Sequence, residues 1–342
     1  MNPDHAIAIQ DRVPIRGTCE DMCPEYERVR RQAQDDMQPP EFTLHGPRRD
    51  RKPDEARMVK AFARSAAGNE AQLPSDIRTP QACMKALAFM FKRVDSEGMR
   101  FMNKYIWDRT RAIRNDLYMQ DGITKPQDVK TRLDCFEQCA RWHIVSLHTM
   151  AAMDDTNYSH QQDLEQLRAT LVTLKEYYGQ HRVAKTVCAN EAEFRSYMLI
   201  SGAMSEVELQ SLPSHIQVHP RIQTALKIGR TANEALAARG QTFAVARKNW
   251  QAFWSLIKSY AVSYHLAAVS ETFFLPVRDM VLTSLFKACR RAGGTQSEDW
   301  TIPHLIDILG FDTADEAIQF CEAYGFSFGT DASGDHFLDL AS

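Results

Sequence analysis

The chain has 342 residues, of which 44% are hydrophobic and 25% charged, and its formal net charge at pH 7 is −3. This is the composition of an ordinary globular protein, and the length suffices for one large helical superstructure or two domains. No apolar run approaches the length of a membrane span, and the N-terminus lacks the basic and apolar regions of a secretory signal. The eight cysteines are scattered and show no disulfide framework, which favours reduced thiols in the nucleus or cytosol.

The first part of the chain lacks a helical period. Pro39 and Pro40 interrupt it, so we expect an extended N-terminal arm over residues 1–52. A helical period starts at Pro53, a residue that suits the first turn of a helix, and predicts a first helix that ends at Gly68.

Helical patterns then dominate. The pattern from Pro126 to about Met153 is the clearest, because its apolar residues step by three and four and share one face. The other helices are expected from Pro80 and over about 99–119, 161–178, 190–201, 204–212, 219–238, 242–258 and 260–274. Successive antiparallel helices without a heptad repeat are typical of an α-solenoid, which we expect over residues 53–275.

After Leu275-Pro276 the pattern changes. A helix over about 277–291 and two short helices precede two brief apolar runs, which flank the polar segment Thr330–Asp335. Three helices followed by a terminal hairpin are typical of a winged helix, expected over residues 276–342. The predicted fold is all-α, a right-handed helical solenoid of PCI type that ends in a winged helix with a small β-hairpin.

The segment Gly17–Arg28 reads GTCEDMCPEYER and closely resembles the G-T-C-x-D-M-C-P-E-x-E-R signature of the SAC/GANP family, the germinal-centre-associated nuclear protein group. Further stretches are similar to that family's blocks in the same order: Leu44-His45, Val59–Ala67, Trp107–Asp116, Glu137–Ile144 and Asn190–Tyr197. The resemblance also implies the PCI-type fold with its winged helix.

This resemblance implies a non-catalytic scaffold subunit of the nuclear complex that couples transcription to mRNA export. Its expected partners are a PCI-domain subunit, docked through the winged helix, and a small acidic subunit. The pair would present a joint basic surface to RNA or DNA, in the nucleus and at the nuclear pore. No cofactor, small-molecule substrate or membrane insertion is implied.

Two groups of cysteines are candidate metal ligands. Cys19 and Cys23 lack a nearby second pair, although a distant ligand such as His45 would be compatible with the sequence. Cys135, Cys139 and His143 are spaced over about 12 Å of one helix, too far for one ion. We therefore expect packed thiols and no stoichiometric zinc.

The sequence contains no signature of catalysis. It has no G-x-x-x-x-G-K-[ST] loop, no G-x-S-x-G turn and no H-E-x-x-H helix. We therefore expect no enzymatic activity and no catalytic residues.

Charge is distributed unevenly near the C-terminus. Residues 221–291 hold eleven Lys/Arg against three Asp/Glu, whereas residues 292–342 hold ten Asp/Glu and no Lys or Arg. The basic stretch is a candidate nucleic-acid surface, and a solvated basic face is the alternative. The candidate residues are Arg247, Lys248, Lys258, Lys287, Arg290 and Arg291. The interleaved Trp250, Phe253 and Trp254 are expected in the core.

The acidic end is expected to bind protein. The recognition helix of a winged helix that reads DNA carries basic or amide side chains, but Thr313–Glu322 carries three acids and no base. Thr313 is expected to cap this helix, with Glu316 completing a capping box. The candidate docking residues are Phe326, Phe328, Asp331, Asp335, Phe337 and Leu338.

The arginines of the Trp107–Asp116 block have a structural interpretation. Arg109, Arg111 and Arg114 are expected to pair with carboxylates such as Glu137 or Glu193. Two other functions remain open: a scaffold at the centrosome or spindle, and a stand-alone RNA-binding module without sequence specificity that acts in transcription or splicing.

Overall fold

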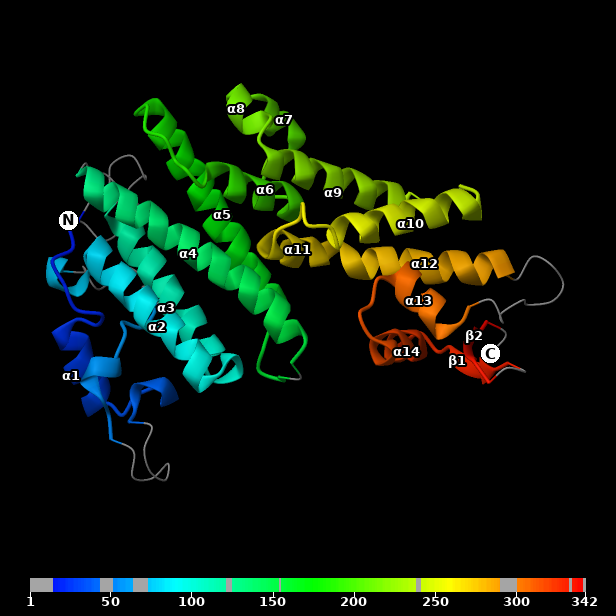
Figure 1. Ribbon diagram of the computed structural model, residues 1–342. Coiled ribbons are helices and arrows are strands. Elements are labelled where there is room, and N and C mark those ends of the chain that lie inside the picture. Colours follow the sequence, from blue (N-terminus) through cyan, green and yellow to red (C-terminus); the bar gives the residue numbers. More distant parts are fainter. Residues whose placement is uncertain are drawn as a thin grey trace, which may run out of the picture. The chain divides into compact units, whose positions relative to one another are not determined.

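The computed structural model describes residues 15–43, 52–63, 73–120, 125–153, 155–237, 241–289, 300–331 and 334–340 (Figure 1). These residues are predominantly helical, so the predicted all-α class is confirmed. The chain divides into two compact units, Met1–Thr186 and Val187–Ser342. Among the described helices, none combines the length and apolarity needed to cross a membrane.

The first unit is built on four long helices. They are α2 (Pro80–Glu97), α3 (Met99–Met119), α4 (Pro126–Ala151) and α5 (His160–Val183). α4 contacts the other three, and this explains why its buried residues extend well beyond one apolar stripe. The starts of the helices follow local chemistry: the side chain of Thr79 accepts from Ala82 N to cap α2, and Ser159 caps α5 in the same way.

The N-terminal arm is partly helical. It contains α1 (Glu25–Ala33) and the short 3₁₀ turn η2 (Pro39–Glu41), so the expectation of an irregular arm was wrong for these residues. Two more 3₁₀ turns, η4 (Glu55–Arg57) and η5 (Pro74–Asp76), lie between the arm and α2. Figure 1 shows α1 beside the helical bundle that contains α2, α3 and α4.

The helix expected from Pro53 to Gly68 is wrong for the described part of that range. Only η4 is helical there, and residues 58–63 have no regular secondary structure. Met58 and Val59 are buried, and Lys60 N donates a hydrogen bond of 3.0 Å to Met22 O. The backbone of this segment is therefore held by the arm, which overrides a weak local helical period.

The second unit is also helical and ends in a hairpin. Its helices are α6 (Glu191–Ser201), α7 (Glu206–Gln210), α8 (Ser214–Gln217), α9 (Pro220–Leu236), α10 (Phe243–Ile257), α11 (Tyr264–Ser270), the 3₁₀ turn η6 (Glu271–Phe273), α12 (Phe274–Cys289), α13 (Ile302–Leu309) and α14 (Ala314–Ala323). The strands β1 (Ser327–Thr330) and β2 (His336–Asp339) form an antiparallel pair in which Phe328 faces Leu338.

An aromatic core joins α10, α12 and α13. Trp250, Phe253 and Trp254 are buried, as predicted. Trp254 Nε1 donates to Ile308 O at 2.8 Å, and its ring lies 5.1 Å from that of Phe274. These contacts join α10 to α12 and α13 within the second unit.

Candidate functional site

The segment that carries the family signature is attached by backbone pairing. Cys19 forms a parallel bridge with Arg78, and Thr18 N donates to Pro74 O at 2.9 Å. Gly17 approaches Ile77 so closely that an added Cβ would lie 2.5 Å from the carbonyl oxygen of Ile77. Only glycine therefore fits at the first position of the signature.

Asp116, near the end of α3, is the charged centre of this attachment. It is fully buried and accepts from Lys60 Nζ at 2.5 Å and from Arg78 Nε at 2.7 Å. Burial alone would lower the pKa of Arg78, but the charge of Asp116 raises it. One turn later, Oε1 of Gln120, the residue that follows α3, accepts from Gly17 N at 3.1 Å, so the end of α3 holds the signature.

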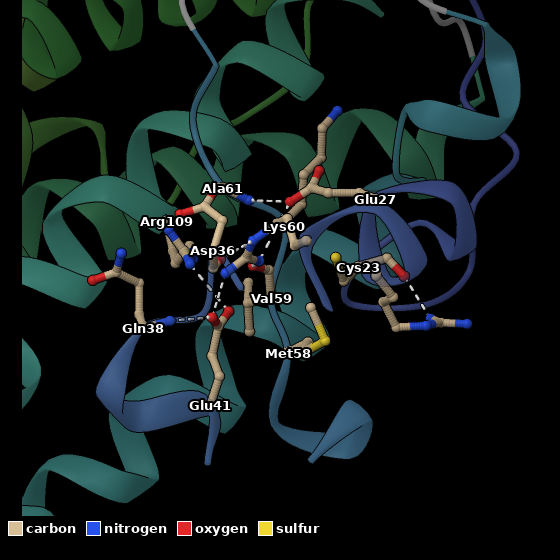
Figure 2. A network of polar contacts seen from close by, with 12 residues as sticks. Cys23, Glu27, Asp36, Gln38, Glu41, Met58, Val59, Lys60, Ala61 and Arg109 are labelled. Atoms are coloured by element: carbon tan, nitrogen blue, oxygen red, sulfur yellow. Dashed lines mark hydrogen bonds and ion pairs between the residues drawn. The ribbon is translucent and has the colours of Figure 1, made fainter. Parts of the chain in front are cut away.

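A second buried network links the arm to α3 (Figure 2). Glu41 of η2 is fully buried and pairs with Arg31 of α1 and, at 3.0 Å, with Arg109 of α3. Burial acts to raise the pKa of Glu41, but the charges of Arg109 and Arg31 outweigh it and the pKa is lowered. A carboxylate between two arginines thus holds three elements together.

Cys23 belongs to the same buried layer. Its carbonyl oxygen accepts from Arg28 Nη1 at 2.6 Å, and burial raises the pKa of its thiol. Cys19 is partly exposed, and its pKa is raised chiefly by burial. The other candidate ligand, His45, lies outside the described residues. Both thiols therefore stay protonated at neutral pH.

The candidate ligands on α4 contact different neighbours. Cys135 Sγ lies 3.9 Å from Pro80 O of α2, and burial raises the pKa of Cys139 to about 12. His143 Nδ1 lies 2.5 Å from Asp163 Oδ1 of α5. Among the described residues, no group of three potential ligands has the arrangement of a metal site.

Of the arginines expected to pair with Glu137 or Glu193, Arg109 and Arg114 have other contacts. Arg109 pairs with Glu41 and Asp108, so the expectation was wrong for this residue. Arg114 donates to Gln166 Oε1 at 2.7 Å, and among the described residues it forms no ion pair. The guanidinium of Arg111 stacks on aromatic rings.

Comparison with known proteins agrees with the resemblance that these motifs carry. The model of the SAC3/GANP family matches residues 22–330. This chain belongs to the SAC3/GANP family. Lys60, Arg109 and Asp116, all in blocks that carried the resemblance, contact the arm or one another.

Three relatives are similar to nearly the whole chain. SAC3 family protein 1 of Schizosaccharomyces pombe is 33% identical over 96% of the chain, which covers 32% of that relative. Protein xmas of Drosophila melanogaster is 27% identical over 91% of the chain and 14% of its own length. SAC3 family protein B of Arabidopsis thaliana is 29% identical over 95% of the chain and 18% of its own length. The chain therefore spans a third or less of these relatives.

The basic candidates lie at both ends of an antiparallel helix pair. Arg247 and Lys248 are near the start of α10 and Lys287 is near the end of α12, and Figure 1 shows these two ends on the same side. Lys258 caps the opposite end of α10, where its Nζ lies 3.6 Å from Asp312 Oδ1. The structure thus groups three candidates and separates Lys258. Arg290 and Arg291 lie outside the described residues.

The docking candidates divide between core and surface. Leu338 is buried, whereas Phe326, Phe328 and Phe337 are half-buried, and Phe326 contacts Phe286 at 6.0 Å between ring centroids. The two acids of the turn differ as well: Asp331 is half-buried and Asp335 is exposed.

The edge of the small sheet is β1. Leu338 N donates to Trp300 O at 3.0 Å, and Phe337 forms a bridge with Thr301, so β2 is covered on its second edge. Because Leu338 directs its N–H away from β1, its partner Phe328 directs its own backbone N–H outward. Proline at Phe328 would therefore remove a backbone N–H that the edge strand directs outward.

The acidic helix α14 begins largely as expected. The side chain of Thr313 accepts from Glu316 N at 3.3 Å. Glu316 Oε2 accepts from Asp312 N at 3.4 Å rather than from the capping residue, so the capping box expected at Thr313 was wrong in this detail. Asp315, Glu316 and Glu322 are exposed, so the helix presents negative charge.

Sequence reasoning missed Glu41 and Asp116 as the centres of the buried networks. Glu41 lies in the arm, 68 residues from Arg109, so no local spacing rule connects them. Asp116 is the last residue of the Trp107–Asp116 block, and its place in that block could have indicated its structural role.

Proposed function

We propose that this chain is a non-catalytic scaffold of a nuclear complex that couples transcription to mRNA export. The observation that carries the proposal is membership of the SAC3/GANP family over residues 22–330. In this proposal residues 1–52 form the arm, residues 53–275 a PCI-type solenoid and residues 276–342 a winged helix. The sequence of α13, α14 and the β1–β2 hairpin supports the last assignment.

The partner in this proposal is a PCI-domain subunit with a small acidic subunit beside it, and the nuclear pore is the place of action. Docking would use the edge strand β1 together with the exposed acids of α14. An edge strand presents backbone donors and acceptors that a partner strand or loop can pair with. Arg247, Lys248, Lys258 and Lys287, with Arg290 and Arg291, would contribute to a joint surface for RNA or DNA.

Affinity purification of the intact chain from nuclear extract, with mass spectrometry of copurifying proteins, tests this proposal. A PCI-domain subunit at equal stoichiometry supports it. RNA without such a subunit would favour the stand-alone RNA-binding module, and centrosomal or spindle proteins would favour the scaffold at that place.

Phe328→Pro and Phe328→Ala form a matched pair for the docking surface. Both remove the ring, but only proline removes the outward N–H. We expect Phe328→Pro to lose the partner and Phe328→Ala to retain most of it. Equal copurification by the two variants would place docking elsewhere. A proline at Leu338 is a poorer probe, because it removes the hydrogen bond to Trp300 O and disturbs the hairpin itself.

A further inference from the structure

A cavity of about 230 Å³ lies in the first unit, between α3, α4, α5 and the segment that ends at residue 63. Its wall includes Phe62, Arg111, Arg114, Tyr118 and Gln166. Among the described residues that line it there are two arginines and no carboxylate. The cavity therefore combines aromatic surface with positive charge.

Arg111 is fixed in the wall by stacking. Its guanidinium carbon lies 4.0 Å from the centroid of the Phe62 ring and 4.8 Å from that of Trp107. Contacts of this kind orient the plane of a guanidinium and hold it beside flat aromatic surface. Arg111 thus presents a planar cation in a defined orientation.

Arg114 lies one turn further along α3, and its guanidinium forms a hydrogen bond with a neutral side chain. Nη2 donates to the neutral Gln166 at 2.7 Å, and the buried Nε has no hydrogen-bond partner among the described residues. Burial lowers the pKa of Arg114 to about 10. Asp163 influences this pKa, but its carboxylate oxygens accept hydrogen bonds from His143 and Ser146. A bound anion would supply a negative counter-charge for the guanidinium of Arg114.

The aromatic and basic lining continues toward α1. A second cavity shares Phe62 and Asn115 with the first, and its wall includes Tyr26 and Arg30. Tyr26 is 70% exposed, and the buried Nε of Arg30 has no partner among the described residues.

Two acids also border this second cavity, and both have structural contacts. Glu27 accepts from Ala61 N at 2.7 Å, and Asp76 accepts from Leu73 N at 3.2 Å. The two cavities are together called the groove below, and their walls contain tyrosine and phenylalanine rings as well as arginines.

We propose that this groove binds single-stranded nucleic acid, with a phosphate at Arg114 and a base against Tyr118. A ring on which a base can stack, close to a cation for the phosphate, is the combination that holds single strands without sequence specificity. An acidic peptide would use the cations but would have no use for the exposed ring of Tyr118. The groove lies in the first unit and the basic residues of α10 and α12 lie in the second, so this inference does not depend on the surface proposed above.

The test is a titration of the intact chain with a fluorescently labelled 15-nucleotide oligouridine at several salt concentrations. We expect Tyr118→Ala to weaken binding about tenfold, the loss of one stacked base. Arg114→Gln should weaken it similarly and lower the slope of log Kd against log salt by about 0.7, one phosphate contact on a single strand. Arg168→Gln, an exposed arginine of α5 outside the cavity, is the matched control and should bind as the wild type does.

Crosslinking keeps the proposal testable if Arg114→Gln fails to fold. RNA containing 4-thiouridine should crosslink to α3 peptides that include Tyr118. The same crosslink should form when Arg247, Lys248, Lys258 and Lys287 are all replaced by glutamine, which separates this site from the basic surface of the second unit.

Three outcomes overturn the inference. Binding that is equally sensitive to Arg168→Gln and Arg114→Gln would indicate a diffuse basic face. Crosslinks confined to the second unit would exclude the groove. Displacement of the RNA by polyglutamate, with affinity for polyglutamate that depends on Arg114 but not on Tyr118, would identify an acidic-peptide site instead.

Discussion

Replacement of Asp116 by asparagine should destabilise the first unit severely. Asp116 is fully buried and accepts from Lys60 Nζ at 2.5 Å and from both Nε and the backbone N of Arg78, at 2.7 and 3.3 Å. Asparagine keeps the shape but leaves two buried cations without their counter-charge. Breaking a buried ion pair in this way costs about 3–5 kcal/mol. With a urea m-value of about 2 kcal/mol/M, the midpoint should fall by about 2 M.

Because the chain has two compact units, the loss should be localised by hydrogen exchange measured on peptic fragments. Fragments from the signature, α2 and α3 should lose protection, and those from the second unit should keep it. Asp128→Asn is the control: Asp128 accepts from exposed Gln81 Nε2, and its replacement should cost less than about 1 kcal/mol. A loss below about 1 kcal/mol for Asp116→Asn, or equal loss in both units, would refute the proposed role of Asp116.

Two further predictions concern a buried histidine and a glycine. Burial lowers the pKa of His143 below its ordinary value of 6.5, so the unfolded chain binds a proton more readily than the folded one. The contribution of His143 to the free energy of unfolding should therefore be fully present above about pH 6.5, and below this pH the free energy should fall by up to about 1.4 kcal/mol per pH unit. Urea titrations at pH 7.5, 6.5 and 5.5 should show a flatter dependence for His143→Gln. Gly310 has φ +67°, and an added Cβ would lie 2.3 Å from the Trp254 ring. Gly310→Ala should cost about 2–4 kcal/mol, measured by thermal unfolding, whereas Gly325→Ala, at φ +86° with open space around it, should cost only about 1 kcal/mol.

The long helices could be predicted because their signals are local. The expected limits of 99–119 coincide with α3, where Gly98 at φ +89° separates two apolar periods. Pro126 marks the start of α4, and Thr79-Pro80 the start of α2. Caps, prolines and apolar spacing act within one or two turns, so a single sequence contains them in full.

The segment after Pro53 shows where local signals fail. Ala56, Val59, Lys60 and Ala63 have helical spacing, but spacing over so short a run cannot report a backbone pairing with Met22. The contact joins residues far apart in sequence, and the hydrogen bonds it provides replace those of a helix. The pairing of Arg109 with Glu41 could not be predicted for the same reason, because Glu41 lies in the arm and is far from Arg109 in sequence.

The residues that carry the family resemblance mainly stabilise the fold. Cys23, Lys60 and Asp116 lie in three different blocks, and each is buried in the layer that attaches the arm to α3. In this structure the blocks therefore hold the N-terminal arm against α3. The side chains that would meet a partner or a single strand, Phe328 and Tyr118, are partly exposed and follow no such pattern. The proposed single-strand site combines both kinds of residue, because Arg114 lies inside the Trp107–Asp116 block and Tyr118 lies just after it.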